Sequence, residues 1–126
     1  MQDNVVKLDV TQEFTVGRES EDMFLLARFF NGFANSTRLS ILLLLADQGE
    51  MRVGDLVVEL DAPQPRISDH LRCLAQCGYV QARRSGRRAY YSITDDRVLE
   101  MLSLGESLLR DNLEHVEACD EVKQGL

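Results

Sequence analysis

Residues 64–91 read QPRISDHLRCLAQCGYVQARRSGRRAYY, a helical pattern followed at once by the pattern of a basic hairpin. Apolar residues in the first half recur at the 3.6-residue spacing that gives a helix one buried face. Gly78 then marks a helix end, because glycine readily adopts the positive φ required there. Aromatic and β-branched residues at 79–83 and 89–92 predict two strands, with residues 85–86 as the turn. The buried face of the predicted helix is formed by Ile67, Leu71, Leu74 and Ala75.

Arginine is concentrated in this stretch, although the chain as a whole is acidic. The formal net charge of −7 would by itself argue against a nucleic-acid ligand. Residues 64–92 nevertheless carry six arginines and one aspartate, a net charge of +5, so the remainder of the chain carries −12. Phosphate contacts are local, because charges are screened beyond roughly 10 Å at moderate salt. A solvated charged surface is the alternative, and the grouping of arginines around one hairpin argues against it.

The residues before this stretch supply two more helices. Residues 35–37 form an N-cap cluster, and the apolar run 39–46 that follows favours a helix over a buried strand. An apolar repeat at helical spacing covers residues 53–60, and Pro63 and Pro65 mark a turn and the start of the next helix. Helix, turn, helix and basic hairpin, in this order, predict a winged helix-turn-helix, mainly α with a β-hairpin wing.

Two segments outside this unit carry more apolar surface than so small a body can cover. Residues 20–32 predict a helix that is apolar on more than one side, and residues 94–96 cap a long helix. That helix runs about 20 residues, near 30 Å, and we expect it to meet its copy in a symmetric homodimer, with the first helix alongside. The alternative is a helix folded wholly onto its own core. The apolar face of this long helix is predicted to consist of Val98, Met101, Leu102, Leu108, Leu109, Leu113 and Val116.

Length and composition limit the remaining possibilities. We divide the chain into an N-terminal arm (1–19), the winged domain with its dimerisation helix (20–118) and a C-terminal tail (119–126). No apolar run reaches the ~18 residues of a membrane span and the N-terminus does not resemble a signal peptide, so we expect a cytoplasmic protein. Three cysteines indicate thiol or metal chemistry more than a disulfide framework. No Ser-His-Asp set, carboxylate pair or phosphate-binding glycine loop is found, so we expect neither an enzyme nor an organic cofactor.

Four segments resemble, in order and spacing, the ArsR/SmtB family of metal-responsive winged-helix repressors. They are NSTRLSIL at 35–42, VGDL at 53–56, QPRISDHL at 64–71 and GRRAYYSI at 86–93, and the resemblance covers roughly residues 22–118. Within the family, the cysteines look most like those of the cadmium- and lead-sensing CmtR type. The resemblance implies a homodimer that binds double-stranded operator DNA and releases it when metal binds.

The resemblance also implies which residues contact DNA. It places the helix that begins near Gln64 in the major groove and the wing arginines on phosphate or in the minor groove. These residue types suit the task, since Gln can read adenine and Arg can read guanine or hold phosphate. Pro63 stands where a capping serine is common in the family. The predicted DNA-binding residues are Gln64, Arg66, Ser68, Asp69, His70, Arg72, Arg84, Arg87 and Arg88.

Cys73, Cys77 and Cys119 are the candidate metal ligands. The first two are four residues apart on a helix, which places their Cβ atoms ~5 to 6 Å apart on one face. This is wider than the ~3.5 to 4.5 Å of a good disulfide but suits one large soft ion. Cys119 lies in a polar tail that could reach the recognition helix of either subunit. Three thiolates favour Cd(II), Pb(II), Hg(II) or As(III) over magnesium or calcium, and small buried hydrophobes are the structural alternative.

Two other effector sites of the family lack their residues here. Arg52-Val53-Gly54 replaces the Cys-Val-Cys of arsenic-type members, and Asp95-Asp96-Arg97 lacks the histidine of the zinc-type site. Two further functions stay open. One is a thiol-redox or electrophile sensor, with Arg72 near enough to lower a thiol pKa. The other is a protein-interaction module that does not bind DNA.

Overall fold

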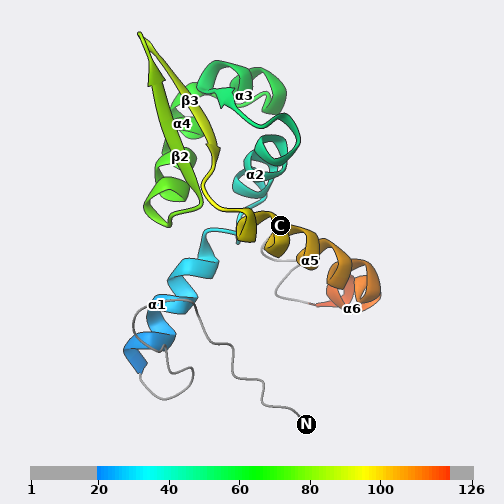
Figure 1. The fold of residues 1–126 in the computed structure, drawn as a ribbon. Helices are drawn as coiled ribbons and strands as arrows, with labels where there is room; N and C mark the ends of the chain where they lie inside the picture. The colour runs from blue at the N-terminus through cyan, green and yellow to red at the C-terminus, as the bar shows by residue number, and fades with distance from the viewer. Residues whose placement is uncertain (1–19, 120–126) are drawn as a thin grey trace.

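The computed structural model describes residues 20–119, and within them the chain forms a winged helix-turn-helix (Figure 1). Helices α2, α3 and α4 and the β2–β3 hairpin form one body, and α1 and the α5–α6 pair extend from one end of it. None of the helices in this range is long and apolar enough to cross a membrane. The elements are α1 (Ser20–Asn31), α2 (Ser36–Gln48), β1 (Met51–Arg52), α3 (Val53–Leu60), α4 (Gln64–Gln76), β2 (Val80–Ser85), β3 (Arg88–Ile93), α5 (Asp96–Asp111) and α6 (Leu113–Ala118).

The core lies between α2, α3, α4 and the base of the wing. Asn35 begins α2 as predicted, and its Oδ1 accepts a hydrogen bond from the Arg38 backbone N–H at 3.0 Å. The apolar run after it is helical, as predicted, and α2 packs against α3, α4 and β3. The predicted fold class is therefore confirmed. The fully buried side chains are Ile41, Leu42, Leu45, Leu56, Ile67, Leu71, Leu74 and Tyr79.

The end of α4 is closed by a double backbone hydrogen bond. The N–H of Gly78 donates to the carbonyl of Ala75 at 3.0 Å, and the N–H of Tyr79 donates to that of Leu74 at 2.9 Å. This pattern is a Schellman motif, which requires a left-handed residue, and Gly78 has φ +85°. The helix stop predicted at Gly78 is therefore confirmed, and it fixes the direction in which the chain enters β2.

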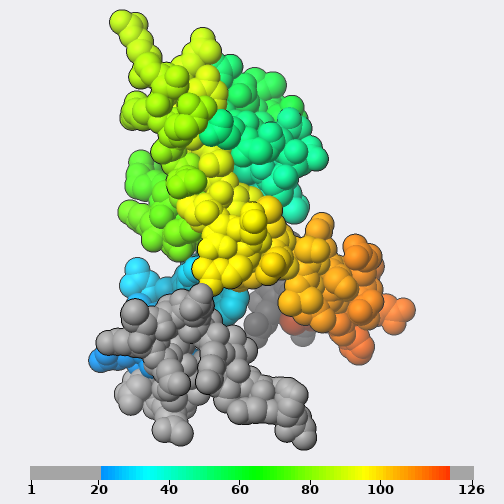
Figure 2. Space-filling model, in the orientation of Figure 1, coloured from blue at the N-terminus to red at the C-terminus, as the bar shows by residue number. Residues whose placement is uncertain are grey.

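The wing is longer than the sequence pattern suggested. Strands β2 and β3 pair antiparallel from Val80 opposite Ile93 to Ser85 opposite Arg88. Since Ser85 still belongs to the ladder, the loop is Gly86-Arg87 and not Ser85-Gly86, with Gly86 at φ +64°. The two-residue strand β1 adds to β3 in the sheet order β1-β3-β2, and was too short to leave a sequence pattern. Figure 2 shows the wing tip projecting past the body.

The C-terminal helix is divided, which corrects the prediction of one helix of about 20 residues. Helix α5 ends at Asp111, and Asn112 leaves helical geometry with φ −121° and ψ 21°. The Asn112 side-chain amide donates to the Leu108 carbonyl at 2.8 Å and so competes with the backbone for it. A short α6 follows. The predicted cap at the start of α5 is confirmed, because Asp95 accepts a hydrogen bond from the Arg97 backbone N–H at 2.8 Å.

Helices α1, α5 and α6 leave much apolar surface uncovered by this chain. Phe24 on α1 is 65% exposed and Leu104 on α5 is 62% exposed, although Val98 and Leu102 of α5 do reach the core. Helix α1 was expected to be apolar on more than one side, and its residue Phe29 packs inward while Phe30 faces outward. The other exposed large apolar residues of these helices are Leu25, Leu108, Leu109 and Leu113.

Candidate nucleic-acid interface and thiol site

Helix α4 presents one polar face to solvent and buries the other in the core. Pro63 is its N-cap and makes no side-chain cap hydrogen bond, and Pro65 occupies the first turn. The helix thus starts where the prolines predicted, without the capping serine common in the family. Ile67, Leu71 and Leu74 are buried. Of the predicted DNA-binding residues on this helix, Gln64, Arg66, Asp69 and Arg72 are exposed, and Ser68 and His70 are half-buried.

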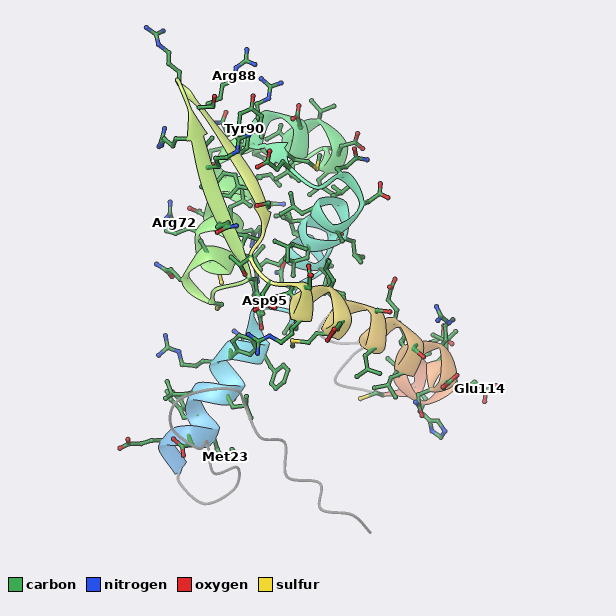
Figure 3. The ribbon with its side chains drawn as sticks, in the orientation of Figure 1. Met23, Arg72, Arg88, Tyr90, Asp95 and Glu114 are labelled. Carbon is green, nitrogen blue, oxygen red and sulfur yellow. The ribbon has the colours of Figure 1, made fainter. Side chains whose placement is uncertain are left out.

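Arg72 and Asp69 form an ion pair on the exposed face of α4. The distance between Arg72 Nη1 and Asp69 Oδ1 is 2.9 Å, and Figure 3 shows the Arg72 side chain pointing outward from the helix. Exposed pairs of this kind contribute little to stability. Arg72 can therefore exchange the carboxylate for a phosphate at small cost.

His70 faces α2 more than solvent. Its Nδ1 lies 3.4 Å from Nη1 of Arg38, and because a guanidinium only donates, Nδ1 is the acceptor. Partial burial, followed by the charges of Arg38 and Arg66, lowers the pKa of His70 below its ordinary value of 6.5, against the opposing charge of Asp69. The neutral imidazole of His70 therefore links α4 to α2.

Two adjacent wing arginines differ in how they are engaged. Arg83 donates from Nε and Nη2 to the carboxylate of Glu50 at 3.0 and 2.9 Å, and its guanidinium carbon lies 4.8 Å from the centre of the Tyr90 ring. This holds the pKa of Glu50 below its usual value. Arg84 makes no salt bridge within residues 20–119. Because successive residues of a strand point to opposite faces, Arg84 lies on the face of the wing opposite to Arg83.

The basic surface predicted from composition is present, with fewer free charges than the residue count suggested. Of the six arginines, Arg72 and Arg83 have carboxylate partners. Among the described residues, no salt bridge involves Arg66, Arg84, Arg87 or Arg88. Arg88 lies at the wing end of the body (Figure 3), and all four are exposed. A groove or backbone of DNA would meet arginines without a salt-bridge partner among the described residues at both the helix and the wing.

The structure brings Cys73 and Cys77 together in the last turn of α4. Both are half-buried free thiols, and the Cys77 N–H donates to the Cys73 carbonyl at 3.0 Å. Burial raises the pKa of Cys77, and the neighbouring Cys73 thiol adds to this, against the charges of Arg38 and Arg28. The cations whose charges act on Cys77 are Arg38 on α2 and Arg28 on α1. Two soft donors on one face can share one soft ion once their protons are displaced.

Cys119 does not join this pair within one chain. It is exposed and ends α6, which Figure 1 shows apart from α4. Across residues 20–119, no group of three or more His, Cys, Asp and Glu side chains is placed to hold a metal. His115 is exposed on α6.

Comparison with known proteins identifies the family. Residues 35–82 match the family described as bacterial regulatory protein, arsR family. The chain is 40% identical over 96 residues to a probable mercury resistance operon repressor of Streptomyces lividans, covering 76% of each chain. The chain belongs to the arsR family. An ArsR-family protein is a DNA-binding transcriptional regulator and not an enzyme, so both of these predictions are confirmed.

Two further relatives place this ArsR-family protein more closely. It is 42% identical over 67 residues to the arsenical resistance operon repressor of Escherichia coli K12, covering 53% of this chain and 57% of that protein. The solved homodimeric winged helix-turn-helix DNA-binding domain of a Mycobacterium bovis protein superposes with a TM-score of 0.70 at 33% identity, covering 82% of this chain and 95% of that one. The relatives do not separate the CmtR type from other metal-sensing types.

Sequence reasoning missed three side chains that shape the site of this ArsR-family protein. Arg38 donates to the carbonyls of Gly32 and Asn31 and contacts His70. Glu50 engages Arg83 across 33 residues of sequence. Tyr79 was read only as a strand residue, yet it is fully buried. A tyrosine directly after a helix-ending glycine is only a weak sequence signal for a buried side chain. The long-range contacts of Arg38 and Glu50 have no sequence signal at all.

Proposed function

We propose that this ArsR-family protein is a homodimeric transcriptional repressor that releases operator DNA when a soft, thiophilic metal ion binds its cysteines. One observation carries the proposal: two half-buried thiols share the end of the helix whose first turn exposes polar side chains suited to base recognition. The relatives named for mercury and arsenical resistance support a thiophilic effector. Cd(II), Pb(II), Hg(II) and As(III) are the candidates, with the Cd/Pb-sensing CmtR type as the arrangement most similar in its cysteines.

Operator binding in this proposal uses α4 and the wing. The exposed side chains at the start of α4 would enter the major groove, as the second helix of a helix-turn-helix does. The wing arginines would contact phosphate or the minor groove. A homodimer would present two such surfaces to two half-sites, and the uncovered apolar faces of α1 and α5 supply the surface for pairing.

Metal binding in this proposal ties the reading helix to the dimer scaffold. Cys73 and Cys77 supply two thiolates from α4, and Cys119 supplies a third from its own chain or from the partner subunit. Joining them restricts the distance and the orientation between the two α4 helices of the dimer. If that geometry does not match two successive major grooves, operator binding is weakened. Because coupling is reciprocal, operator DNA weakens metal binding by the same factor.

The test is operator binding by fluorescence anisotropy, using reduced full-length protein and DNA from upstream of its own gene. Titration with Cd(II), Pb(II), Hg(II) and As(III), each alone, should lower the affinity by at least about tenfold for the cognate ion, within the usual range of allosteric coupling. Cys77→Ser and Cys119→Ser should bind the operator like the wild type and lose the release. Ala75→Ser is the matched control, because it adds a hydroxyl to the same exposed turn without removing a thiol, and it should respond normally. Metal-triggered release that persists in both cysteine variants would refute the assigned site.

The alternative effector is an oxidant or electrophile acting on the same thiols. The two functions differ in what happens to the thiols, because an oxidant or electrophile modifies them covalently whereas a metal ion binds them as thiolates. The same assay distinguishes the two functions when hydrogen peroxide replaces the metal. Release by peroxide alone, with no stoichiometric thiolate-to-metal absorption band, would favour the redox function.

A further inference from the structure

The C-terminal end of α1 is held by two side chains that belong to the DNA-reading body. The Tyr79 hydroxyl donates to the carbonyl of Phe29 at 2.5 Å. Arg38 donates from Nε to the carbonyl of Gly32 and from Nη2 to that of Asn31, both at 2.9 Å. The Phe29 and Asn31 carbonyls also accept the local backbone N–H groups of Gly32 and Ala34, at 3.1 and 3.0 Å, so each side chain adds a second donor from outside the helix. Tyr79 and Arg38 therefore connect α1, which has an uncovered apolar face, to the body that contains α4 and its two thiols.

Tyr79 fits closely into the end of α1. It is fully buried, and its ring centre lies 4.8 Å from that of Phe29 and 4.6 Å from that of Phe33, with the Phe33 ring stacked at 23°. Gly32 closes the site, because a Cβ atom there would collide with Cε2 of the tyrosine ring and lie 3.1 Å from Cδ2. We call the site formed by Phe29, Gly32 and Phe33 the Tyr79 socket.

The other end of Tyr79 is fixed to the thiol turn of α4. Its N–H donates to the Leu74 carbonyl in the Schellman motif, and it follows Cys77 by two residues. A change in the last turn of α4 therefore has a short path through Tyr79 to α1.

We propose that Tyr79 is a positioning residue that transmits occupancy of the Cys73–Cys77 pair to α1 through its hydrogen bond to the Phe29 carbonyl. The inference rests on the proposed function and adds a route within one chain by which metal reaches the dimer scaffold. Joining the two thiols reshapes the last turn of α4, and the Schellman motif carries that change into the Tyr79 backbone. Because the Tyr79 side chain fills the socket, its movement changes the orientation of α1 relative to α2, α3, α4 and the wing.

Arg38 makes the inference testable. Its hydrogen bonds hold α1 to the start of α2 without involving the Tyr79 hydroxyl. Removing only the Tyr79 hydroxyl therefore leaves α1 attached while it breaks the polar link to α4. Tyr79→Phe retains the buried ring and its contacts with Phe29 and Phe33. Tyr91→Phe is the matched control, because Tyr91 is half-buried on β3 and makes no side-chain hydrogen bond within residues 20–119.

The experiment compares wild type, Tyr79→Phe and Tyr91→Phe as full-length reduced proteins, with Hg(II) and Cd(II) as separate probes. Metal stoichiometry is read from thiolate charge-transfer absorption, and operator affinity is measured with and without metal. Tyr79→Phe should bind metal at the wild-type stoichiometry and bind the operator with nearly wild-type affinity in its absence. The operator affinity without metal, divided by the affinity with metal, should be about fivefold smaller in Tyr79→Phe than in the wild type, which corresponds to the net contribution of one hydrogen bond. Tyr91→Phe should retain the full wild-type ratio.

A purely structural role would lower the unfolding temperature without changing the affinity ratio, and that result would overturn the inference. An equal loss of the ratio in Tyr91→Phe would overturn it as well. Gly32→Ala tests the same contact from α1, since the added methyl displaces the tyrosine ring, and it should reduce the ratio with both thiols intact. A wild type that binds the operator but does not respond to metal would refute the proposed function itself, and the route through Tyr79 with it.

Discussion

His70 lies on the helix expected to read DNA, yet its Nδ1 atom faces the guanidinium of Arg38. This contact requires the neutral imidazole, because a protonated ring would have no acceptor there and would place a second cation beside Arg38 and Arg66. Asp69 offsets only part of that repulsion. The residue that resembled a base-reading histidine thus has a second task, which is to hold α4 against α2.

The lowered pKa of His70 predicts how stability depends on pH. The unfolded chain binds the proton more tightly than the folded one, so the contribution is complete above the ordinary pKa of 6.5 and is lost as the pH falls below it. His70→Asn keeps an acceptor for Arg38 and cannot titrate, so the decline in the urea midpoint between pH 7.5 and 5.5 should become shallower. The measurement is urea unfolding at fixed protein concentration.

His115→Asn is the control for this prediction, because His115 is exposed on α6 and far from Arg38 in sequence. It should keep the wild-type pH dependence. The assignment would be wrong if the His115 variant flattened the profile and the His70 variant did not. Glu50 and Asp55 cannot account for a decline in this range, because their pKa values are lowered from values already below 5.

At the scale of elements, the wing separates two kinds of arginine on one strand. Arg83 is engaged by Glu50 and lies over Tyr90, whereas Arg84 points to the other face without a salt bridge among the described residues. An arginine already paired with a carboxylate releases fewer counterions when DNA binds than an unpaired one does.

Substitution of these neighbours should separate their roles. Arg84→Ala should weaken operator binding and reduce the slope of log affinity against log salt by about 1, as expected for one lost phosphate contact. Arg83→Ala should leave that slope nearly unchanged. Anisotropy titrations at a series of NaCl concentrations give both slopes. Equal reductions in the two variants would show that the Glu50 pair does not persist on DNA.

Local signals predicted α2, α3 and α4 because each has its own cap, apolar period or proline. Asn35, Pro63 and Gly78 mark helix ends through their own conformational preferences, which do not depend on the rest of the chain. The division of the last helix depends on Asn112, whose side-chain bond to the Leu108 carbonyl has no strong sequence signature.

The parts of the site that were not predicted depend on contacts between residues distant in sequence. Tyr79 meets Phe29 across 50 positions, and Arg38 meets His70 across 32. The spacing of Cys73 and Cys77 was enough to place them in one turn, because four residues is a helical repeat. Burial and neighbours, which set the pKa of Cys77, could not be read from that spacing.

At the scale of the whole molecule, exposed apolar side chains are unevenly distributed. Most of them gather on α1 and along α5 and α6, outside the winged body, whereas Leu43 on α2 and Val58 on α3 are the two exceptions among the described residues, at 42% and 79% exposure. Contiguous apolar surface of this kind marks an interaction site, whereas a single exposed residue needs no explanation. The distribution supports the proposed pairing of two copies through the terminal helices.

Leu108→Asp should convert the proposed dimer into a monomer, because it places a charge in the apolar surface of α5. Helix content should stay the same, since this side chain is exposed in the single chain. Val58→Asp introduces the same charge at a still more exposed apolar residue and should leave the dimer intact. Sedimentation equilibrium gives the masses, and operator affinity should fall with dimerisation in the Leu108 variant. A monomeric Val58 variant beside a dimeric Leu108 variant would contradict the assignment.

In helix α4 the side chains proposed to contact DNA begin in the first turn, whereas the thiol pair closes the last turn of its 13 residues. At 1.5 Å per residue the two ends are roughly 20 Å apart. Mutation can therefore alter the donor atoms at one end without altering base recognition at the other. A lineage, or a laboratory building a biosensor, could exchange the signal that the protein detects and retain the promoter that it controls.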